Sequence, residues 1–296
     1  NKMIINKLAK NSVKSNKKQY GILFFTIVLS AFMLFCVFTI GWTYLDSSRL
    51  QNTRLNGAEY DITTMNGFTS KQVKSLQSNK NIQNVGMESY AGFIKSSEFD
   101  NTVEIGLLWC DETFWNNLMS PARTKLDGHY PQNKNELMVT KDILKACGNE
   151  NLSVGDSIVL TYENNTGVHT DKFVISGIWD GYGDKSAGFV SKNFYDETGY
   201  DLKNDGILCI KLNRNYVLPT TIQSLEKSLN FSDRQIFAPT DYIENSFKLL
   251  LGICGLALVI CLSAYLLIYN ILYLSISGKI RYYGLLQSLG MTKKQL

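Results

Sequence analysis

The sequence is poor in the residues that build metal and redox sites. It has two histidines, His129 and His169, and none of its six cysteines forms a CxxC pair. Structural zinc sites need four Cys, His or carboxylate ligands at short spacings, so we expect no metal. The three cysteines outside the apolar segments, Cys110, Cys147 and Cys209, are an odd number and can form at most one disulfide.

Signatures of catalysis are also missing. The sequence contains no glycine-rich P-loop for ATP, and neither Ser157 nor Ser176 has a histidine at a telling spacing. The Asp and Glu residues are spread along predicted loops and strand edges, which is typical of a solvated surface. We therefore predict that the chain is not an enzyme, that it has no catalytic residue and that it binds no cofactor itself.

Two long runs contain no charged residue, Tyr20 to Leu45 and Leu249 to Gly278. A helix rises about 1.5 Å per residue, so roughly 20 apolar residues cross the hydrocarbon core of a membrane. We predict transmembrane helices over 20–45 and 247–276, packed side by side and surrounded by membrane lipid. The first run is too long for the core of a cleaved signal peptide, and no small-x-small cleavage site follows it.

Acidic residues are absent from both ends of the chain. All 26 Asp and Glu residues lie between Asp46 and Glu244, whereas eleven of the 30 Lys and Arg residues lie outside that interval. Basic residues near the ends of spans stay in the cytoplasm. We predict a multi-pass protein of a bacterial plasma membrane with cytoplasmic ends, 1–19 and 277–296. Topology explains the net charge of +4, so we expect no nucleic-acid partner.

The region between the runs, residues 46–246, is predicted to be a mixed α/β extracytoplasmic domain. Alternating or apolar patterns predict strands within 58–64, 85–94, 103–109, 135–140, 154–162, 173–179 and 207–212. Capping and proline signals predict helices at 69–76, 141–146 and 220–229, and a last helix that starts near Asp241 and continues into the second span. The polar run 163–171 predicts a hairpin loop that contains His169.

We predict two subdomains within this domain. Residues 58–108 and 200–240 form the first, and residues 111–195 form an insertion richer in strands. Both spans leave one membrane surface, so the first and last outer segments should begin and end close together. The fold class is an α+β membrane protein, in which two transmembrane helices flank a mixed α/β domain.

The tail, residues 277–296, predicts a helical elbow. A helix that continues past the second span has an apolar stripe of leucines between residues 285 and 289, and Gly290 is placed to end it as a left-handed cap. Thr292 and Gln295 then form a capping box for a new helix, so we expect the chain to be the N-terminal part of a longer one. The other reading is an amphipathic helix on the membrane surface.

The same tail resembles a known family. The run RYYGLLQSLGMTKKQL, residues 281–296, resembles the segment after the second span of FtsX-like ABC transporter permeases, which include macrolide exporters, lipoprotein-releasing permeases and bacitracin-type resistance transporters. Four outer motifs resemble, in order, the MacB-like periplasmic core domain: GHYP (128–131), NELMV (135–139), VGDSIVL (154–160) and FVISGI (173–178). Many members carry a glutamate where this chain has Tyr282, so a charged contact is missing there.

The resemblance implies a permease subunit of an ABC transporter. A separate ATPase subunit would bind ATP, sit on the elbow and move the outer domain, for export or extraction of a peptide or lipid-like substrate. A second permease copy or a fused half would complete the transporter, with further spans after Leu296. The residues expected to contact the ATPase are Arg281, Leu285, Leu286, Leu289, Gly290, Thr292, Lys293 and Lys294.

A membrane-bound sensor or receptor with an extracytoplasmic ligand-binding domain is the alternative function. A receptor tail should continue as a parallel helical relay with heptads, whereas this tail breaks at Gly290 and restarts at Thr292. Peptide export, antibiotic resistance, lipoprotein release and cell-wall regulation all use the permease architecture, and the sequence does not choose among them.

Overall fold

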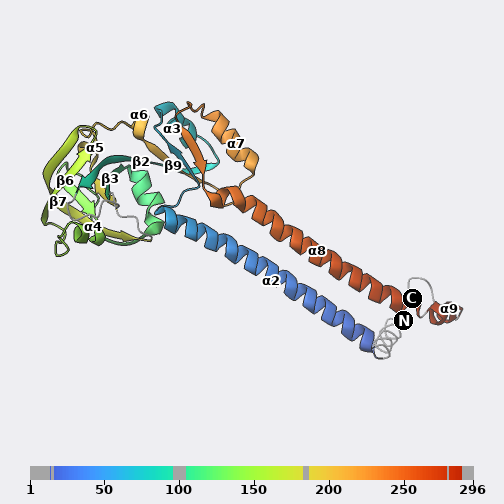
Figure 1. Ribbon diagram of the computed structural model, residues 1–296. Coiled ribbons are helices and arrows are strands. Elements are labelled where there is room, and N and C mark those ends of the chain that lie inside the picture. Colours follow the sequence, from blue (N-terminus) through green and yellow to red (C-terminus); the bar gives the residue numbers. More distant parts are fainter. Residues whose placement is uncertain (1–13, 15–16, 96–104, 183–186, 279, 289–296) are drawn as a thin grey trace. The chain divides into compact units, whose positions relative to one another are not determined.

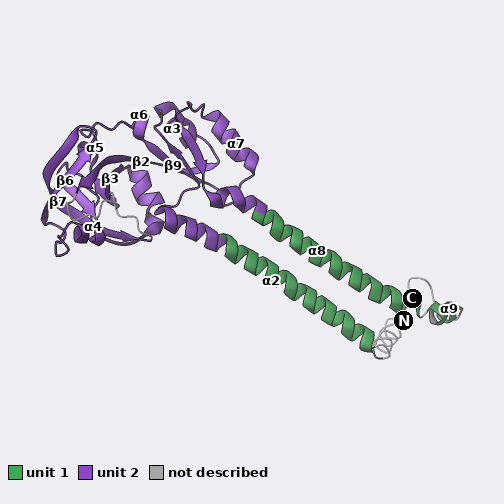
Figure 2. Ribbon diagram, in the orientation of Figure 1, with its two compact units in different colours: residues 1–45, 249–296 green, residues 46–248 purple. Residues whose placement is uncertain are grey.

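The computed structural model describes residue 14 and residues 17–95, 105–182, 187–278 and 280–288. The chain divides into two compact units (Figure 2), one of residues 1–45 with 249–296 and one of residues 46–248. Each unit is described by itself below.

The first unit consists mainly of the apolar parts of two long helices, α2 (Lys17–Asn56) and α8 (Asp241–Ser277) (Figure 1). By length and composition both could cross a membrane, and almost none of their most apolar windows is buried within the described chain. Phe25, for example, is 71% exposed. An apolar surface of this length is unstable in water, so lipid or neighbouring helices must cover it.

Within the first unit the two helices meet at a glycine. A Cβ atom built on Gly41 of α2 would lie 2.6 Å from Cδ1 of Ile253 in α8, closer than real side-chain contacts. Small residues let membrane helices approach each other closely. Gly41 therefore marks the level at which α2 and α8 contact each other.

The second unit is built on one mixed sheet, which has ten strands in the described part of the chain (Figure 1). The strand order is β10-β1-β9-β2-β3-β8-β5-β7-β4, and β6 pairs with both β2 and β7. The pairs β3–β8 and β5–β7 are parallel. The strands are β1 (Ile62–Met65), β2 (Ile82–Lys95), β3 (Ile105–Cys110), β4 (Arg123–Gly128), β5 (Glu136–Val139), β6 (Ser157–Asn164), β7 (Gly167–Gly181), β8 (Ala187–Val190), β9 (Ile207–Leu212) and β10 (Ile236–Pro239).

Short helices connect these strands. They are α3 (Ser70–Gln77), a π-helical turn (Phe114–Leu118), a 3₁₀ turn (Ser120–Ala122), α4 (Lys141–Ala146), α5 (Lys192–Tyr195), α6 (Leu202–Asp205) and α7 (Pro219–Ser228). A mixed sheet domain flanked by two long apolar helices confirms the predicted fold class.

Local capping signals predicted several helices correctly. At the start of α3, Thr69 Oγ1 accepts the Gln72 N–H at 3.3 Å, and Gln72 Oε1 accepts the Thr69 N–H at 2.9 Å, which is the predicted capping box. The bounds of α4 and β9 agree with those read from the sequence. Helix α7 starts at Pro219, where the missing N–H costs no helical hydrogen bond.

Other predictions were wrong in detail. The first strand starts at Ile62 rather than 58, because the N–H of Glu59 donates instead to the Leu118 carbonyl at 2.6 Å. His169 lies within β7 opposite Tyr162, and the hairpin turn is shorter than predicted, at residues 165–166. Strands β4, β8 and β10 were not predicted.

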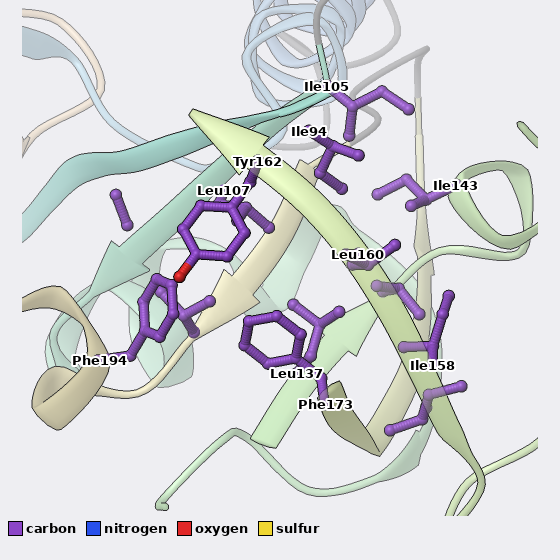
Figure 3. Close-up of a cluster of buried hydrophobic side chains, with 14 of the residues drawn as sticks. Ile94, Ile105, Leu107, Leu137, Ile143, Ile158, Leu160, Tyr162, Phe173 and Phe194 are labelled. Atoms are coloured by element: carbon purple, nitrogen blue, oxygen red, sulfur yellow. The ribbon is translucent and has the colours of Figure 1, made fainter. Parts of the chain in front are cut away.

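Buried apolar side chains fill the second unit in three clusters. Figure 3 shows the first, where Leu107, Leu137 and Phe173 from strands β3, β5 and β7 are at most 1% exposed. The second holds the buried Trp115 and Trp179. The buried members of the third all lie within 62–85 and 208–243. This cluster joins both parts of the predicted first subdomain, but the sheet runs on without a break, so the two-subdomain division stays a prediction.

Candidate functional site

The outer end of helix α2 brings a basic side chain into the second unit. Arg49 Nη1 lies 3.4 Å from Oε1 of Glu59, and Arg49 Nη2 lies 3.7 Å from Oδ1 of Asp46. Gly57, with φ +67°, reverses the chain after the helix. The reversal returns Glu59 to the side of the helix that it follows.

A buried lysine continues the chain of charges into the sheet. Lys211 Nζ lies 3.2 Å from Oε1 of Glu59 and 3.3 Å from Oδ2 of Asp61, and the side chains of Lys211 and Asp61 are 8% and 2% exposed. Asp61 Oδ2 also accepts the Leu212 N–H at 2.8 Å. Burial raises the pKa of Asp61, although Lys211 and the Leu212 N–H oppose that rise by favouring the carboxylate.

The backbone of Asp61 reaches the start of helix α8. Its carbonyl accepts the Thr240 N–H at 2.8 Å. Thr240 precedes the helix, and its Oγ1 accepts the Ile243 N–H at 3.5 Å, as expected for a capping residue. Ile243 is fully buried in the third cluster and anchors this first turn.

We call Arg49, Glu59, Asp61 and Lys211 the base network. It pairs two cations with two carboxylates. Through Arg49 it holds the outer end of α2, and through the Asp61 carbonyl it holds the start of α8. Removing one partner of a buried ion pair typically costs about 3–5 kcal/mol, because the other charge is left uncompensated. The network is held together by these ion pairs and by the hydrogen bond that the Asp61 carboxylate accepts from the Leu212 N–H.

The predicted elbow is described in part. The sequence predicted that one helix continues past the second span, but α8 ends at Ser277 and a separate helix, α9 (Ile280–Ser288), follows. Gly278 lies at the break, where its low helix propensity favours an end.

The predicted contact residues fall on both sides of the limit of the described chain. Arg281 and Leu285 lie in α9 and are exposed, Leu285 by 63%. Leu286 lies in the same helix. The remaining predicted contacts lie outside the described residues: Leu289, Gly290, Thr292, Lys293 and Lys294. The ATPase contact stays a prediction.

Other chemistry finds little support. Among the described residues, no group of three or more His, Cys, Asp and Glu side chains could hold a metal ion. Cys110 and Cys209 lie in β3 and β9, on opposite sides of β2. Two strand spacings make about 9–10 Å, more than the roughly 7 Å that a disulfide can bridge between Cα atoms. These two cysteines therefore cannot pair without backbone movement.

The base network was not predicted, although the sequence contains a signal for it. Asp61 and Lys211 are charged residues within strand-like runs, AEYDITT and ILCIKL. Asp and Lys are rarely fully buried unless they are paired, so a charge inside an apolar strand indicates a partner nearby. What the sequence could not supply is the register of β1 on β9, which places Ile62 opposite Ile210.

No family model matches the sequence, and no curated protein sequence matches it. Solved structures do resemble its fold. The periplasmic region of MacB from Actinobacillus actinomycetemcomitans is 16% identical with a TM-score of 0.43, over 65% of this chain and 95% of that one. The extracellular domain of the ABC-type transporter YknZ from Gram-positive bacteria is 11% identical with a TM-score of 0.39, over 61% and 99%.

Both neighbours are extracytoplasmic domains of other proteins. At identities and TM-scores of this size the likeness concerns the fold, and it does not by itself assign a function.

Proposed function

We propose that the chain is a permease subunit of an ABC transporter, in which a separate ATPase drives movement of the outer domain. The observation that carries the proposal is helix continuity. Helix α2 runs unbroken from Lys17 to Asn56 and α8 from Asp241 to Ser277, so each includes both an apolar span and residues of the second unit. Successive backbone hydrogen bonds hold each turn of a helix, so a displacement at one end is passed along its axis.

The base network supports this role at the outer end. It reaches α2 through the partly exposed Arg49–Glu59 pair and the start of α8 through the Asp61 carbonyl, and the buried Lys211–Asp61 pair between them is costly to separate. In the proposed mechanism, a force along either helix would reach the sheet through these contacts at Glu59 and Asp61.

The inner end would receive the force from the ATPase. Helix α9 presents an exposed leucine and an exposed arginine, Leu285 and Arg281, in the segment whose sequence resembles the elbow of such permeases. An exposed apolar side chain flanked by positive charge suits a partner surface with a hydrophobic pocket and acidic rim. ATP itself would be bound by the partner.

The spans favour a substrate handled outside the membrane centre. Neither uncharged run, 20–45 or 249–278, contains a buried ionisable residue of the kind that marks an ion or proton pathway. Export or extraction of a peptide or lipid-like substrate from the outer face agrees with this. The bare apolar surfaces of α2 and α8 leave room for lipid and for a second permease copy or fused half. In this arrangement both ends are cytoplasmic, and residues 46–246 lie outside the plasma membrane.

The test is a charge placed on helix α9 of the complete transporter. Leu285→Asp should abolish co-purification of the ATPase and coupled ATP turnover in membranes, without lowering the amount of permease. Gln287→Asp is the matched control, because it adds the same charge to an exposed position about 200° further round the helix. Full ATPase binding and coupled turnover in Leu285→Asp would show that α9 is a membrane-surface helix. The sensor alternative instead predicts no ATPase in the wild-type complex.

A further inference from the structure

A polar groove of about 460 Å³ opens in the second unit. Three segments that are distant in sequence line it: residues 66–75, residues 203–204 and residues 228–235. Apart from Leu229, the side chains that line it are polar or charged. The groove therefore suits a hydrophilic ligand rather than an acyl chain.

The charges in the groove have one sign. Lys71, Lys203 and Arg234 line it, and none of the described residues that line it is Asp or Glu. In the described part of the chain, none of the three forms an ion pair with a carboxylate. Of the acids that are near these cations in sequence, Asp201 uses its Oδ1 to accept the Lys203 N–H at 3.1 Å. Three cationic groups thus face one groove without partners of opposite charge.

Two amide side chains that line the groove, Gln72 and Gln235, hold its segments together. The buried Gln72 donates from Nε2 to the Leu229 carbonyl at 3.1 Å, and Gln235 donates from Nε2 to the Gly67 carbonyl at 2.7 Å. Gly67 also brings the wall segments together, since a Cβ there would lie 1.9 Å from the Lys203 carbonyl oxygen. Because the hydrogen bonds of these lining side chains are already formed, little further ordering is needed when a ligand binds.

A hydrogen bond fixes the third segment that lines the groove, residues 228–235. Asn66, in the left-handed conformation at φ +65°, donates from Nδ2 to the Arg234 carbonyl at 2.8 Å. The backbones that carry Lys71, Lys203 and Arg234 are therefore positioned before any ligand arrives, and their long side chains can close on it.

We infer that this groove binds a phosphate-bearing ligand with a polar body. A single carboxylate would leave two of the three cations unpaired, whereas a phosphate monoester or diphosphate carries two or more negative charges. The planar guanidinium of Arg234 can bind two phosphate oxygens at once, and the two lysines act as point charges. The volume exceeds that of a lone phosphate, which leaves space for a sugar or glycerol body. This inference does not rest on the proposed transport role.

The experiment measures phosphate binding by the full chain in nanodiscs of neutral phosphatidylcholine. Inorganic pyrophosphate, titrated by calorimetry, tests a soluble source of phosphate. Co-sedimentation with vesicles that contain phosphatidic acid tests a lipid headgroup. The variant combines Lys71→Gln, Lys203→Gln and Arg234→Gln. Because exposed ion pairs each contribute modestly, we expect the three changes together to raise Kd about tenfold or more.

The matched control removes three other exposed lysines, Lys125→Gln, Lys145→Gln and Lys172→Gln, which lie outside the groove. It has the same change in net charge and should bind as wild type. Binding in either arm that the groove variant loses and the control keeps supports the inference, and the arm identifies the source. No binding by wild type in both arms, or equal loss in variant and control, would overturn it.

Discussion

Lys211→Met is the sharpest test of the base network. Methionine has nearly the length of lysine, so the substitution keeps the apolar stem and removes the charge between Glu59 and Asp61. Two carboxylates then face each other without a cation between them. The Asp61 carboxylate is destabilised most, since its side chain is 2% exposed and cannot be solvated by water in place of Lys211.

The size of the loss in stability depends on the contacts that Glu59 and Asp61 keep after the substitution. Breaking a buried ion pair by removing one partner costs about 3–5 kcal/mol when the other charge is left bare. Here Glu59 keeps Arg49 at 3.4 Å and is 24% exposed, and Asp61 keeps the Leu212 N–H at 2.8 Å. We therefore expect a loss of about 2–4 kcal/mol in the free energy of unfolding. For a domain of this size that lowers Tm by about 4–16 °C.

The assay is unfolding of the full chain in detergent micelles, followed by tryptophan fluorescence. Trp109, Trp115 and Trp179 are all buried in the second unit and report on it. Lys125→Met, at an exposed position of β4, is the control and should change stability little. Adding Asp61→Asn to Lys211→Met should reveal a coupling energy of about 1–3 kcal/mol, since the two charges are in contact. A single-variant loss no larger than the control's, or strict additivity, would refute the reasoning.

Two further predictions concern a half-buried carboxylate, Asp111, and the tail. Burial raises the pKa of Asp111 above the ordinary aspartate value of 3.8, even though backbone N–H groups donate to its carboxylate. A raised pKa means that the folded state holds the proton more tightly, so this contribution to stability is present below pH 3.8 and is lost as pH rises through the folded pKa. Asp111→Asn keeps an acceptor oxygen but does not titrate, so wild type should lose stability relative to it as pH rises above 3.8; parallel melting profiles from acidic to neutral pH would contradict this. In the tail, Leu289→Asp should uncouple ATP turnover whereas Lys294→Ala should do little, because losing a packed leucine costs about 2–5 kcal/mol and an exposed charge pair about 1 kcal/mol or less. Equal turnover in these two variants would place Leu289 outside the contact.

The parts of the fold that could be read from sequence are set by residues close together in the chain. The Thr69–Gln72 capping box and the end of α4 before Gly148, with φ +69°, both depend on contacts within one or two turns. The apolar runs were equally clear, because their length alone matches a membrane. Such features can be recognised without knowing which distant residues they contact.

The missed strands depend on partners that are distant in sequence. Strand β4, RTKLDG, is mostly exposed and polar, and only its pairing with β7 makes it a strand. Strand β8, AGFV, is buried but too short to show a period, and it is held between β3 and β5. Strand β10 ends in Pro239 at an edge of the sheet, where a missing N–H is tolerated.

The composition of the base network bears on how a permease of the proposed kind would work. Apolar residues of similar volume often stabilise a protein more than a buried ion pair does, so stability alone gives little reason for Lys211 and Asp61. An apolar contact can slide, because its energy depends on area and not on direction. Charged hydrogen bonds hold one geometry, since Lys211 must stay near 3.3 Å from both carboxylates to compensate them. In the proposed permease, a joint that must pass a small displacement from α2 to the sheet gains from this fixed geometry.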